Sequence, residues 1–399
     1  MVEVRRSDYL GMLWSGKDAN DVIKVVVGMR RAGKSTLLNQ YIAMLIDSGV
    51  DRSSIFKLDF DTVRDQAITE KDMLNQWIIE NIPDDRQTYV FLDEIQNVKD
   101  WEMSVAALQT MKLCDVYITG SNSKMLSSEI STKLSGRYIE IRVQPFSFKE
   151  YLEMHPSDDV DKRFMDYLTY GGLPVIDPDK DPRFIEGLLE GVFNTVLVKD
   201  VLERLKTDDV SKIVSISRFL YSNIGNLTSI DSVAKATGIG NSTVSRYIEE
   251  MQMAHLFHHA ERYDIVGKKF LKTNGKYYAS DLGLRTVSLG ASKGRDFSRP
   301  LENVVYLELL RRGYKVSVGC FRSLEIDFIA KRLDTVEYYQ VCQTLGSVET
   351  YEREVRPYKG IKDNYRKTIL TMDRFGLGQD EGIEVRNVVD WLLDRVDNR

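Results

Sequence analysis

Val25-Val26-Val27-Gly28-Met29-Arg30-Arg31-Ala32-Gly33-Lys34-Ser35-Thr36 is the stretch that decides the fold of this 399-residue chain. It has the pattern G-x-x-x-x-G-K-S, with a β-branched run before it and the apolar run 37–42 after it. In the order strand, loop and helix, such a loop turns its backbone N–H groups and the positive helix end toward phosphate oxygens. The stretch therefore predicts a nucleotide-binding loop (P-loop) whose contacts come from Gly28, Arg30, Arg31, Ala32, Gly33, Lys34, Ser35 and Thr36.

Two side chains of this loop have specific expected roles. Lys34 would reach the β- and γ-phosphates of ATP, and the hydroxyl of Ser35 would bind Mg²⁺. The alternative is a chance Gly-Lys-Ser sequence at a turn, which the strand and helix on the correct sides disfavour.

A second element of the same site is expected at Thr88–Glu94, a hydrophobic strand that ends in two carboxylates. Asp93 would hold the water shell of Mg²⁺, and Glu94 would act as the base that polarises the attacking water. Strands often end in acids, so this pattern gains its weight from the P-loop that precedes it.

Two further positions are candidates for the hydrolytic machinery. The strand Asp115–Thr119 ends in Gly120-Ser121-Asn122, and ligands of parallel sheets bind at such carboxyl ends. Ser121 or Asn122 would contact the γ-phosphate or the attacking water, unless they only cap a helix. Arg137, at the start of a later strand, is expected to reach the nucleotide of a neighbouring subunit; a surface arginine is the alternative.

Bulk properties are those of a soluble globular protein, with 43% hydrophobic residues, 29% charged residues and a net charge of -5. No apolar run is long enough to span a bilayer, and Met1–Arg6 is not followed by the apolar core of a signal peptide. The isolated residues Cys114, Cys320 and Cys342 fit reducing conditions, so we expect a cytoplasmic protein without a membrane partner. The charge leaves room for a local basic patch that binds nucleic acid.

A helix-turn-helix is predicted between Thr228 and Ile248, where a Gly-Ile-Gly turn separates two helical patterns. The following hairpin, with strands at 256–263 and 275–279, carries five basic residues: Arg262, Lys268, Lys269, Lys272 and Lys276. Together they predict a winged helix, in which Ser242, Thr243 and Arg246 meet a DNA groove and Lys268, Lys269 and Lys272 meet phosphates. The alternative is a module that docks proteins.

Four of these motifs together resemble the AAA+ superfamily ATPases of bacteria and archaea. They are the P-loop with its paired Arg30-Arg31, Leu92-Asp93-Glu94-Ile95-Gln96, Thr119-Gly120-Ser121-Asn122-Ser123 and Gly136-Arg137. The paired arginine is similar to the clade of archaeal ATPases, STAND switches and Orc/Cdc6 initiators. The resemblance also implies a helical lid in which Gly171-Gly172-Leu173-Pro174 places Pro174 near the nucleotide base.

The C-terminal region is expected to form a helix at 302–312 and strands at 314–321, 323–330 and 337–343, and it resembles the PD-(D/E)XK nuclease fold. Glu302 and Asp327 match two metal-binding acids of that fold, but Gln340 stands at the position of a third acid and Cys342 at that of a lysine. A metal held by the remaining acids would be under-coordinated, so we expect a vestigial nuclease site. A later basic run is either a phosphate-facing surface or a solvated helix: Arg353, Arg356, Lys359, Lys362, Arg366 and Lys367.

The sequence thus predicts an α/β protein of four parts. A nucleotide-binding AAA+ domain with a parallel sheet is expected at 1–155, a helical lid at 156–222, a winged helix at 223–290 and an inactive nuclease-like α/β domain at 295–399. The expected function is Mg²⁺-dependent ATP hydrolysis by a hexameric ring that acts on duplex or branched, Holliday-junction-like DNA. The alternatives are a STAND-like switch with a protein partner, or an active metal-dependent nuclease.

Overall fold

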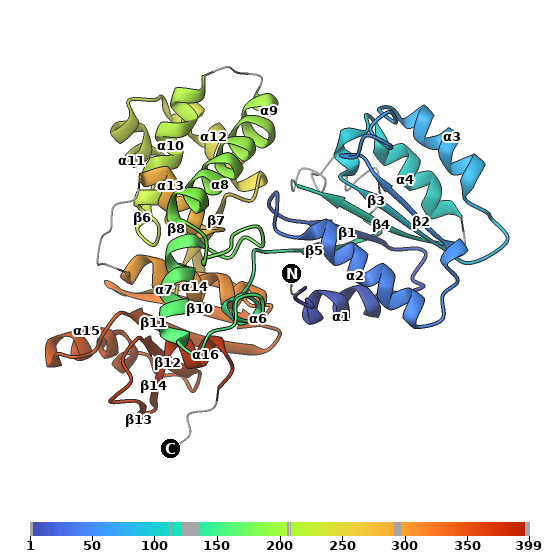
Figure 1. The fold of residues 1–399 in the computed structure, drawn as a ribbon. Coiled ribbons are helices and arrows are strands. Elements are labelled where there is room, and N and C mark those ends of the chain that lie inside the picture. Colours follow the sequence, from blue (N-terminus) through green and yellow to red (C-terminus); the bar gives the residue numbers. More distant parts are fainter. Residues whose placement is uncertain are drawn as a thin grey trace. The chain divides into compact units, whose positions relative to one another are not determined.

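Two compact units make up the computed structural model of the chain (Figure 1). The first comprises Met1–Pro145 together with Met253–His255, and the second comprises Phe146–Gln252 and Leu256–Arg399. The described residues are 3–111, 113–121, 134, 136–205, 207, 209–290 and 297–395, without the side chains of Lys272 and Thr273. No helix within these ranges is both long enough and apolar enough to cross a membrane.

The first unit is built on a five-stranded parallel sheet with the strand order β2-β3-β4-β1-β5. Its strands are β1 (Ile23–Val27), β2 (Ile55–Asp59), β3 (Thr88–Asp93), β4 (Cys114–Gly120) and β5 (Tyr138–Arg142). Every residue of β1, β3 and β4 is buried, as expected for parallel strands that are covered on both faces. This sheet confirms the predicted α/β core.

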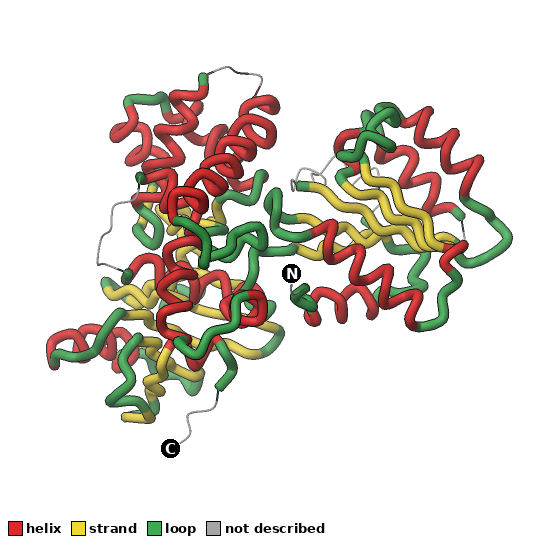
Figure 2. Tube along the Cα trace, viewed as in Figure 1, coloured by secondary structure: helices red, strands yellow, loops and turns green. Residues whose placement is uncertain are grey.

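Helices cover both faces of this sheet (Figure 2). They are α1 (Ser7–Ser15), α2 (Lys34–Asp47), α3 (Lys71–Asn81) and α4 (Trp101–Thr110), with the short 3-10 helices η1 (Arg52–Ser54) and η2 (Ile95–Asn97). Because side chains alternate along a strand, Val90 and Leu92 of β3 pack with Leu74 of α3 on one face. Phe91 points to the other face, where its ring stacks on Tyr117 and meets Tyr41 of α2.

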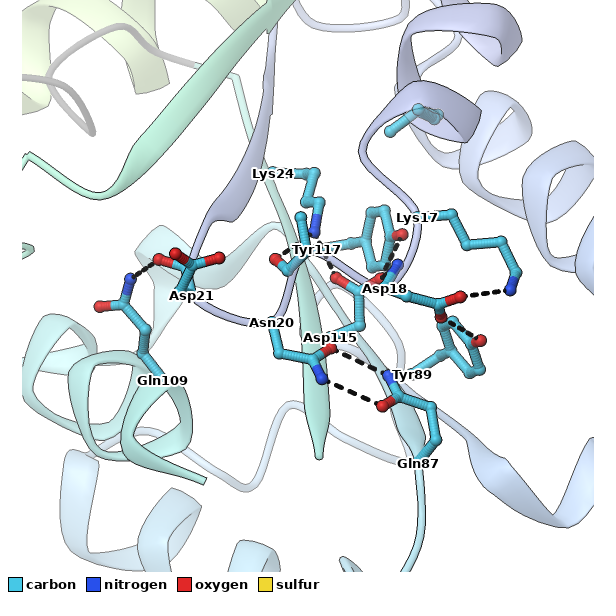
Figure 3. Close-up of polar contacts among 12 residues, drawn as sticks. Lys17, Asp18, Asn20, Asp21, Lys24, Gln87, Tyr89, Gln109, Asp115 and Tyr117 are labelled. Atoms are coloured by element: carbon cyan, nitrogen blue, oxygen red, sulfur yellow. Dashed lines mark hydrogen bonds and ion pairs between the residues drawn. The ribbon is translucent and has the colours of Figure 1, made fainter. Parts of the chain in front are cut away.

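A buried ion pair lies at the amino-terminal end of these strands (Figure 3). The ammonium of Lys24 on β1 binds the carboxylate of Asp115 on β4, and both side chains have no exposed surface. The other oxygen of Asp115 accepts hydrogen bonds from the hydroxyl of Tyr117 and the backbone N–H of Asp18, each at 2.9 Å. Burial raises the pKa of Asp115 although Lys24 opposes that shift, so the pair depends on both partners.

Replacing Lys24 by methionine is expected to destabilise the first unit by about 3–5 kcal/mol, because it leaves the Asp115 charge buried without its counter-ion. Hydrogen exchange of the β1 and β4 amides would measure the loss in that unit alone. A double variant, Lys24→Met with Asp115→Leu, should recover most of it. The matched control is Arg142→Met, which breaks an ion pair with Glu140 on the edge strand β5 and should cost less than about 1 kcal/mol. Equal losses in the two single variants would contradict the prediction.

The second unit contains a nine-stranded mixed sheet with the order β13-β14-β12-β11-β10-β9-β7-β8-β6. Its strands are β6 (Leu227–Thr228), β7 (Phe257–Asp264), β8 (Lys269–Ala279), β9 (Lys315–Phe321), β10 (Leu324–Arg332), β11 (Thr335–Cys342), β12 (Arg366–Thr371), β13 (Gly378–Asp380) and β14 (Ile383–Asn387). The hairpin β7–β8 joins the C-terminal strands because Arg262, Tyr263 and Asp264 pair in parallel with β9. One sheet therefore joins strands from before and after residues 290–295, where the sequence predicts a domain boundary.

The second unit contains helices in the predicted lid, in the predicted helix-turn-helix and near the predicted helix at 302–312, together with helices that the sequence does not predict, such as the one at Leu282–Leu289. They are α6 (Phe148–Met154), α7 (Val160–Tyr170), α8 (Pro182–Thr195), α9 (Glu203–Leu205), α10 (Val210–Ser222), α11 (Ile230–Thr237), α12 (Asn241–Met253), α13 (Leu282–Leu289), α14 (Ser298–Arg311), α15 (Val348–Lys359) and α16 (Val388–Leu392), with one π-helix, η4 (Val196–Leu202). A capping box of Ser229 and Ser232 starts α11, and Gly238 ends it in the left-handed conformation. Helices α11 and α12 thus form the expected helix-turn-helix, whereas the winged-helix and nuclease-like domains remain predictions.

Candidate nucleotide-binding site

The P-loop follows β1 directly and has the backbone conformations that its glycines allow. Gly28 has a φ of 153° and Gly33 a φ of 95°. The backbone N–H of Val143 donates to the carbonyl of Val27, and a Cβ added at Gly28 would lie 2.1 Å from the Val143 carbonyl oxygen. A side chain at Gly28 would therefore push the loop away from the chain that follows β5.

Lys34 begins α2 and folds back over the loop. Its ammonium donates to the carbonyl oxygens of Gly28 at 3.1 Å and Met29 at 3.4 Å, and it lies 3.3 Å from the carboxylate of Glu94. These two side chains are nearly enclosed, with 3% and 11% of their surface exposed. The structure thus brings together the lysine and the glutamate that the sequence predicts for one site, although 60 residues separate them.

Glu94 is anchored by its backbone and by its side chain. It has a φ of 54°, and its N–H donates to the hydroxyl of Thr119 on β4 at 2.8 Å. Its second carboxylate oxygen accepts a hydrogen bond from the side-chain amide of Gln96. Burial raises the pKa of Glu94, but the charge of Lys34 and the bond from Gln96 outweigh it, so the pKa lies below its usual range. The carboxylate is therefore ionised at neutral pH.

Asp93 is fully buried beside Glu94 at the end of β3. One carboxylate oxygen accepts a hydrogen bond from the hydroxyl of Thr119. The other has no hydrogen bond within the described part of the chain and lies 3.5 Å from the ammonium of Lys57 on β2. A buried carboxylate oxygen without a donor fits a site for the water shell of a divalent cation.

The remaining predicted residues of this site surround the loop. Ser35 is half-buried and Thr36 exposed in the first turn of α2, and Arg31 is exposed with a φ of 65°. The guanidinium of Arg30 lies 3.9 Å from the carboxylate of Asp61, and Ala32 is buried. Ser121 is buried after β4, with its hydroxyl 3.5 Å from the amide of Gln96, and Asn122 lies outside the described residues.

Arg137 is exposed at the start of β5, at the amino-terminal end of the strands, whereas the P-loop follows the carboxyl end of the neighbouring strand β1. Because Ile23 pairs with Tyr138, Arg137 lies beside the beginning of β1, whereas the loop follows the end of that strand. At about 3.3 Å per residue the length of β1 alone separates the two by roughly 13 Å. Arg137 is thus placed away from the loop of its own chain.

Four residues of the site have no predicted role in the sequence: Arg6, Lys57, Gln96 and Thr119. Gln96 and Thr119 stand inside motifs that carry the AAA+ resemblance, so their position in those motifs was an available signal. Arg6 is buried and donates from its guanidinium to the carbonyl of Ala32 at 3.0 Å. No local pattern indicates that contact, because 26 residues separate the two partners.

The Gly-Gly-x-Pro segment belongs to the second unit, where it binds a carboxylate. The N–H of Gly172 donates to Asp281 at 2.8 Å, and Asp281 also caps α13 by accepting from the N–H groups of Gly283 and Leu284. Gly171 has a φ of 76°, and a Cβ there would lie 2.2 Å from the Asp281 carboxylate. A Cβ at Gly172 would lie 2.5 Å from the carbonyl oxygen of Phe146, so close contacts account for both glycines. The role of half-buried Pro174 near a nucleotide base stays a prediction.

Asp281 should make the stability of the second unit fall as the pH rises. Burial raises its pKa to about 6 although several N–H groups oppose that shift. The native state then holds the proton more tightly than the unfolded chain, so the stabilisation is complete below pH ~4 and is lost as the pH rises through ~6. Between pH ~5 and ~7.5 this group should remove about 1 kcal/mol from the free energy of unfolding. Urea unfolding at both pH values would measure it; the Asp281→Asn variant should lack this part of the pH dependence, and identical profiles would contradict it.

The predicted DNA-contacting residues lie on two surface elements. Ser242 and Arg246 are exposed on α12, where Thr243 is half-buried. Lys268 and Lys269 are exposed at the turn of the β7–β8 hairpin, and the side chain of Lys272 lies outside the described residues. Lys276 lies on the hairpin as expected, but only 3% of its side chain is exposed and it contacts carboxylates, so it does not contribute to a basic surface.

The expected nuclease residues lie close together in the second unit. Glu302 on α14 and Asp327 on β10 both lie against the ammonium of Lys276, and the side chain of Gln340 on β11 accepts from the N–H of Asp327. Four residues of the later basic run pair with neighbouring acids, which favours the solvated-surface alternative for them: Arg353, Lys359, Arg366 and Lys367.

Two family models match parts of the chain, and the first of them covers the P-loop. A family model described as "AAA domain" matches residues 20–152, and a domain of unknown function (DUF8612) matches residues 161–295. Among solved structures, the crystal structure of Cdc6p from Pyrobaculum aerophilum is similar, with 12% identity, a TM-score of 0.33, and coverage of 72% of this chain and 94% of that one.

Two full-length relatives are similar along almost the whole chain. An uncharacterized protein of Haemophilus influenzae is 39% identical over 98% of both chains. The uncharacterized protein MJ1544 of Methanocaldococcus jannaschii is 30% identical over 92% of this chain and 85% of its own length. The chain therefore belongs to one family with these two proteins, and its residues 20–152 match the AAA domain model.

Proposed function

We propose that this protein hydrolyses ATP at the P-loop, with Lys34 binding the β- and γ-phosphates and Glu94 polarising the attacking water. The contact of 3.3 Å between the Lys34 ammonium and the Glu94 carboxylate carries this proposal. The two side chains lie side by side at the carboxyl ends of β1 and β3, where parallel sheets bind ligands, and this supports the roles of phosphate-binding cation and base.

Mg²⁺ fits the donors of the site. Ser35 would supply a hydroxyl ligand, and the carboxylate oxygen of Asp93 that lacks a hydrogen-bond donor would accept from a metal-bound water. When bound, Mg²⁺ neutralises charge that develops on the phosphate oxygens. Thr119 holds the other oxygen of Asp93, so that carboxylate is already oriented.

Nucleotide binding would change the partner of Glu94. A triphosphate competes for the Lys34 ammonium, and once Lys34 turns to the phosphates the carboxylate loses its strongest stabilising charge. The pKa of Glu94 then rises from its lowered value, which makes the group a better proton acceptor. Gln96 would keep the released carboxylate in place through its remaining hydrogen bond.

We further propose that the protein assembles as a homo-oligomeric ring and acts on duplex or branched DNA. The position of Arg137 at the amino-terminal end of the strands, away from the P-loop of its own chain, supports a site completed by a neighbouring subunit. Support for DNA comes from the exposed residues at the start of α12 and the exposed lysines of the hairpin turn. A recognition helix beside a basic hairpin suits a groove flanked by phosphates.

ATP turnover measured with and without DNA tests this function. The wild-type protein should hydrolyse ATP with Mg²⁺, and a four-way junction or a duplex should raise the rate above that with single-stranded DNA. The Lys34→Ala variant should lose both nucleotide binding and turnover. Unchanged turnover in that variant would overturn the ATPase assignment, and no response to any of the three DNAs would overturn the DNA assignment alone.

A nucleotide-dependent switch with a protein partner is the second candidate. The observation that favours it is the closed arrangement of Glu94 between Lys34 and Gln96, which would hold the base away from water until a signal releases it. Slow turnover that DNA does not change, together with an ATP-dependent change in native mass, would favour the switch over the DNA-directed ATPase.

A further inference from the structure

A lysine occupies the centre of the cluster where the nuclease resemblance expects a metal. Lys276 lies on β8, and its ammonium is 2.9 Å from Glu302 of α14 and 2.8 Å from Glu325 of β10. The same ammonium is 3.7 Å from Asp327. Three carboxylates from two elements thus converge on one buried cation that a third element supplies.

Further hydrogen bonds hold Glu302, Asp327 and Gln340 in this cluster. The hydroxyl of Tyr278 donates to Glu302 at 2.7 Å, and the N–H of Val341 donates to the second oxygen of Asp327 at 2.9 Å. Gln340 accepts from the N–H of Asp327 and donates to Glu354 at 3.1 Å, so both ends of its side-chain amide are used. These bonds hold the carboxylates of Glu302 and Asp327 in place beside the ammonium.

This arrangement does not fit a divalent metal. Mg²⁺ and Ca²⁺ need several oxygen ligands at roughly 2.0–2.6 Å around one point, and here that point is filled by an ammonium at hydrogen-bond distance. Within the described ranges, no group of three or more His, Cys, Asp or Glu side chains has an arrangement that could hold a metal ion. A buried ammonium is itself stable only when it is paired, and the three carboxylates provide that pairing.

We propose that Lys276 is the resident cation of this cluster, so that its ammonium excludes a divalent metal and fastens the hairpin to the C-terminal helix and strands. A second contact supports the fastening: the side chain of Asn303 on α14 binds both the N–H and the carbonyl of Ala279, at 2.7 and 2.8 Å. The cluster is thus a structural ionic junction, and a nuclease reaction through these acids has no metal to use.

Two measurements test this inference. Mn²⁺ binding in nucleotide-free buffer is measured from the electron paramagnetic resonance signal of free Mn²⁺, and stability is measured by thermal unfolding. The Lys276→Met variant should lose about 10 °C of thermal midpoint, because three acids lose their counter-ion. It should also gain one bound Mn²⁺ per chain, which restores part of the midpoint. The matched control is Lys269→Met, which removes an exposed lysine of the same strand and should change neither measurement.

A second comparison uses proteins that retain Lys276, so the inference can be tested even if the Lys276→Met variant does not fold. The wild-type protein and the double variant Glu302→Gln with Asp327→Asn should bind the same amount of Mn²⁺. Loss of bound Mn²⁺ in the double variant would overturn the inference, because the acids would then be metal ligands beside Lys276. A Lys276→Met protein with unchanged stability and no gained Mn²⁺ would overturn it as well.

Discussion

Glu94→Gln protein should bind ATP at least as tightly as the wild type and hydrolyse it ~100-fold or more slowly. Glutamine keeps the size of the side chain and its hydrogen bond with Gln96, but it cannot accept a proton from water. It also removes the carboxylate that pairs with the Lys34 ammonium, so Lys34 is free for the phosphates before ATP arrives. Binding and turnover should therefore change in different ways.

Single-turnover hydrolysis and equilibrium binding of a fluorescent ATP analogue would measure the two effects separately. The matched control is Glu80→Gln, an exposed glutamate on α3 of the same unit, which should leave both unchanged. Turnover at the wild-type rate in the Glu94→Gln protein would show that another group activates the water. Loss of binding together with turnover would point to misfolding of the loop rather than to lost chemistry.

Arg137→Ala should reduce ATP turnover by about 10³-fold if the guanidinium stabilises the transition state in a neighbouring subunit. Its place at the start of β5, roughly 13 Å along the sheet from the end of β1, separates it from the P-loop of its own chain. The control is Arg142→Ala on the same strand, where the arginine pairs with Glu140 at the surface. That variant should keep its activity.

Mixing two inactive variants distinguishes action on a neighbour from action within one chain. A mixed assembly of Arg137→Ala and Glu94→Gln subunits contains some interfaces with an intact Glu94 on one side and an intact Arg137 on the other. Those interfaces should recover a measurable part of the wild-type turnover. Absence of any recovery, with mixed assembly shown by native mass, would refute a role for Arg137 across an interface.

The contacts of Lys276 change the role that we expect for the acids of the C-terminal region. The resemblance to the nuclease fold suggests that Glu302, Asp327 and Gln340 form a metal site in which one acid is missing. The structure instead places the Lys276 ammonium among the acids, so a positive charge from the chain stands where the metal ion is expected. An ion pair within the protein costs no metal and cannot be removed by a chelator, which suits a permanent connection between two parts of one unit.

Local patterns were sufficient to predict where the P-loop and the two acids at the end of β3 lie in the fold. The P-loop residues, Asp93 and Glu94 were predictable because each belongs to a short stretch in which strand, turn and helix signals follow one another within about ten residues. The parallel sheet was predictable for the same reason, since β1, β3 and β4 are continuous apolar runs that only a sheet covered on both faces would bury.

The sequence by itself therefore determined the α/β core with its P-loop and the two groups of opposite charge that lie beside it, Lys34 and Glu94. Only the tertiary structure decided the partners that lie far apart in the chain: Lys24 with Asp115, Gly172 with Asp281, and Lys276 with Glu302. In each case a polar group is buried, and burial without a partner would cost several kcal/mol, so the fold must supply one. Which residue supplies it depends on how distant elements pack, and no periodicity of the local sequence records that.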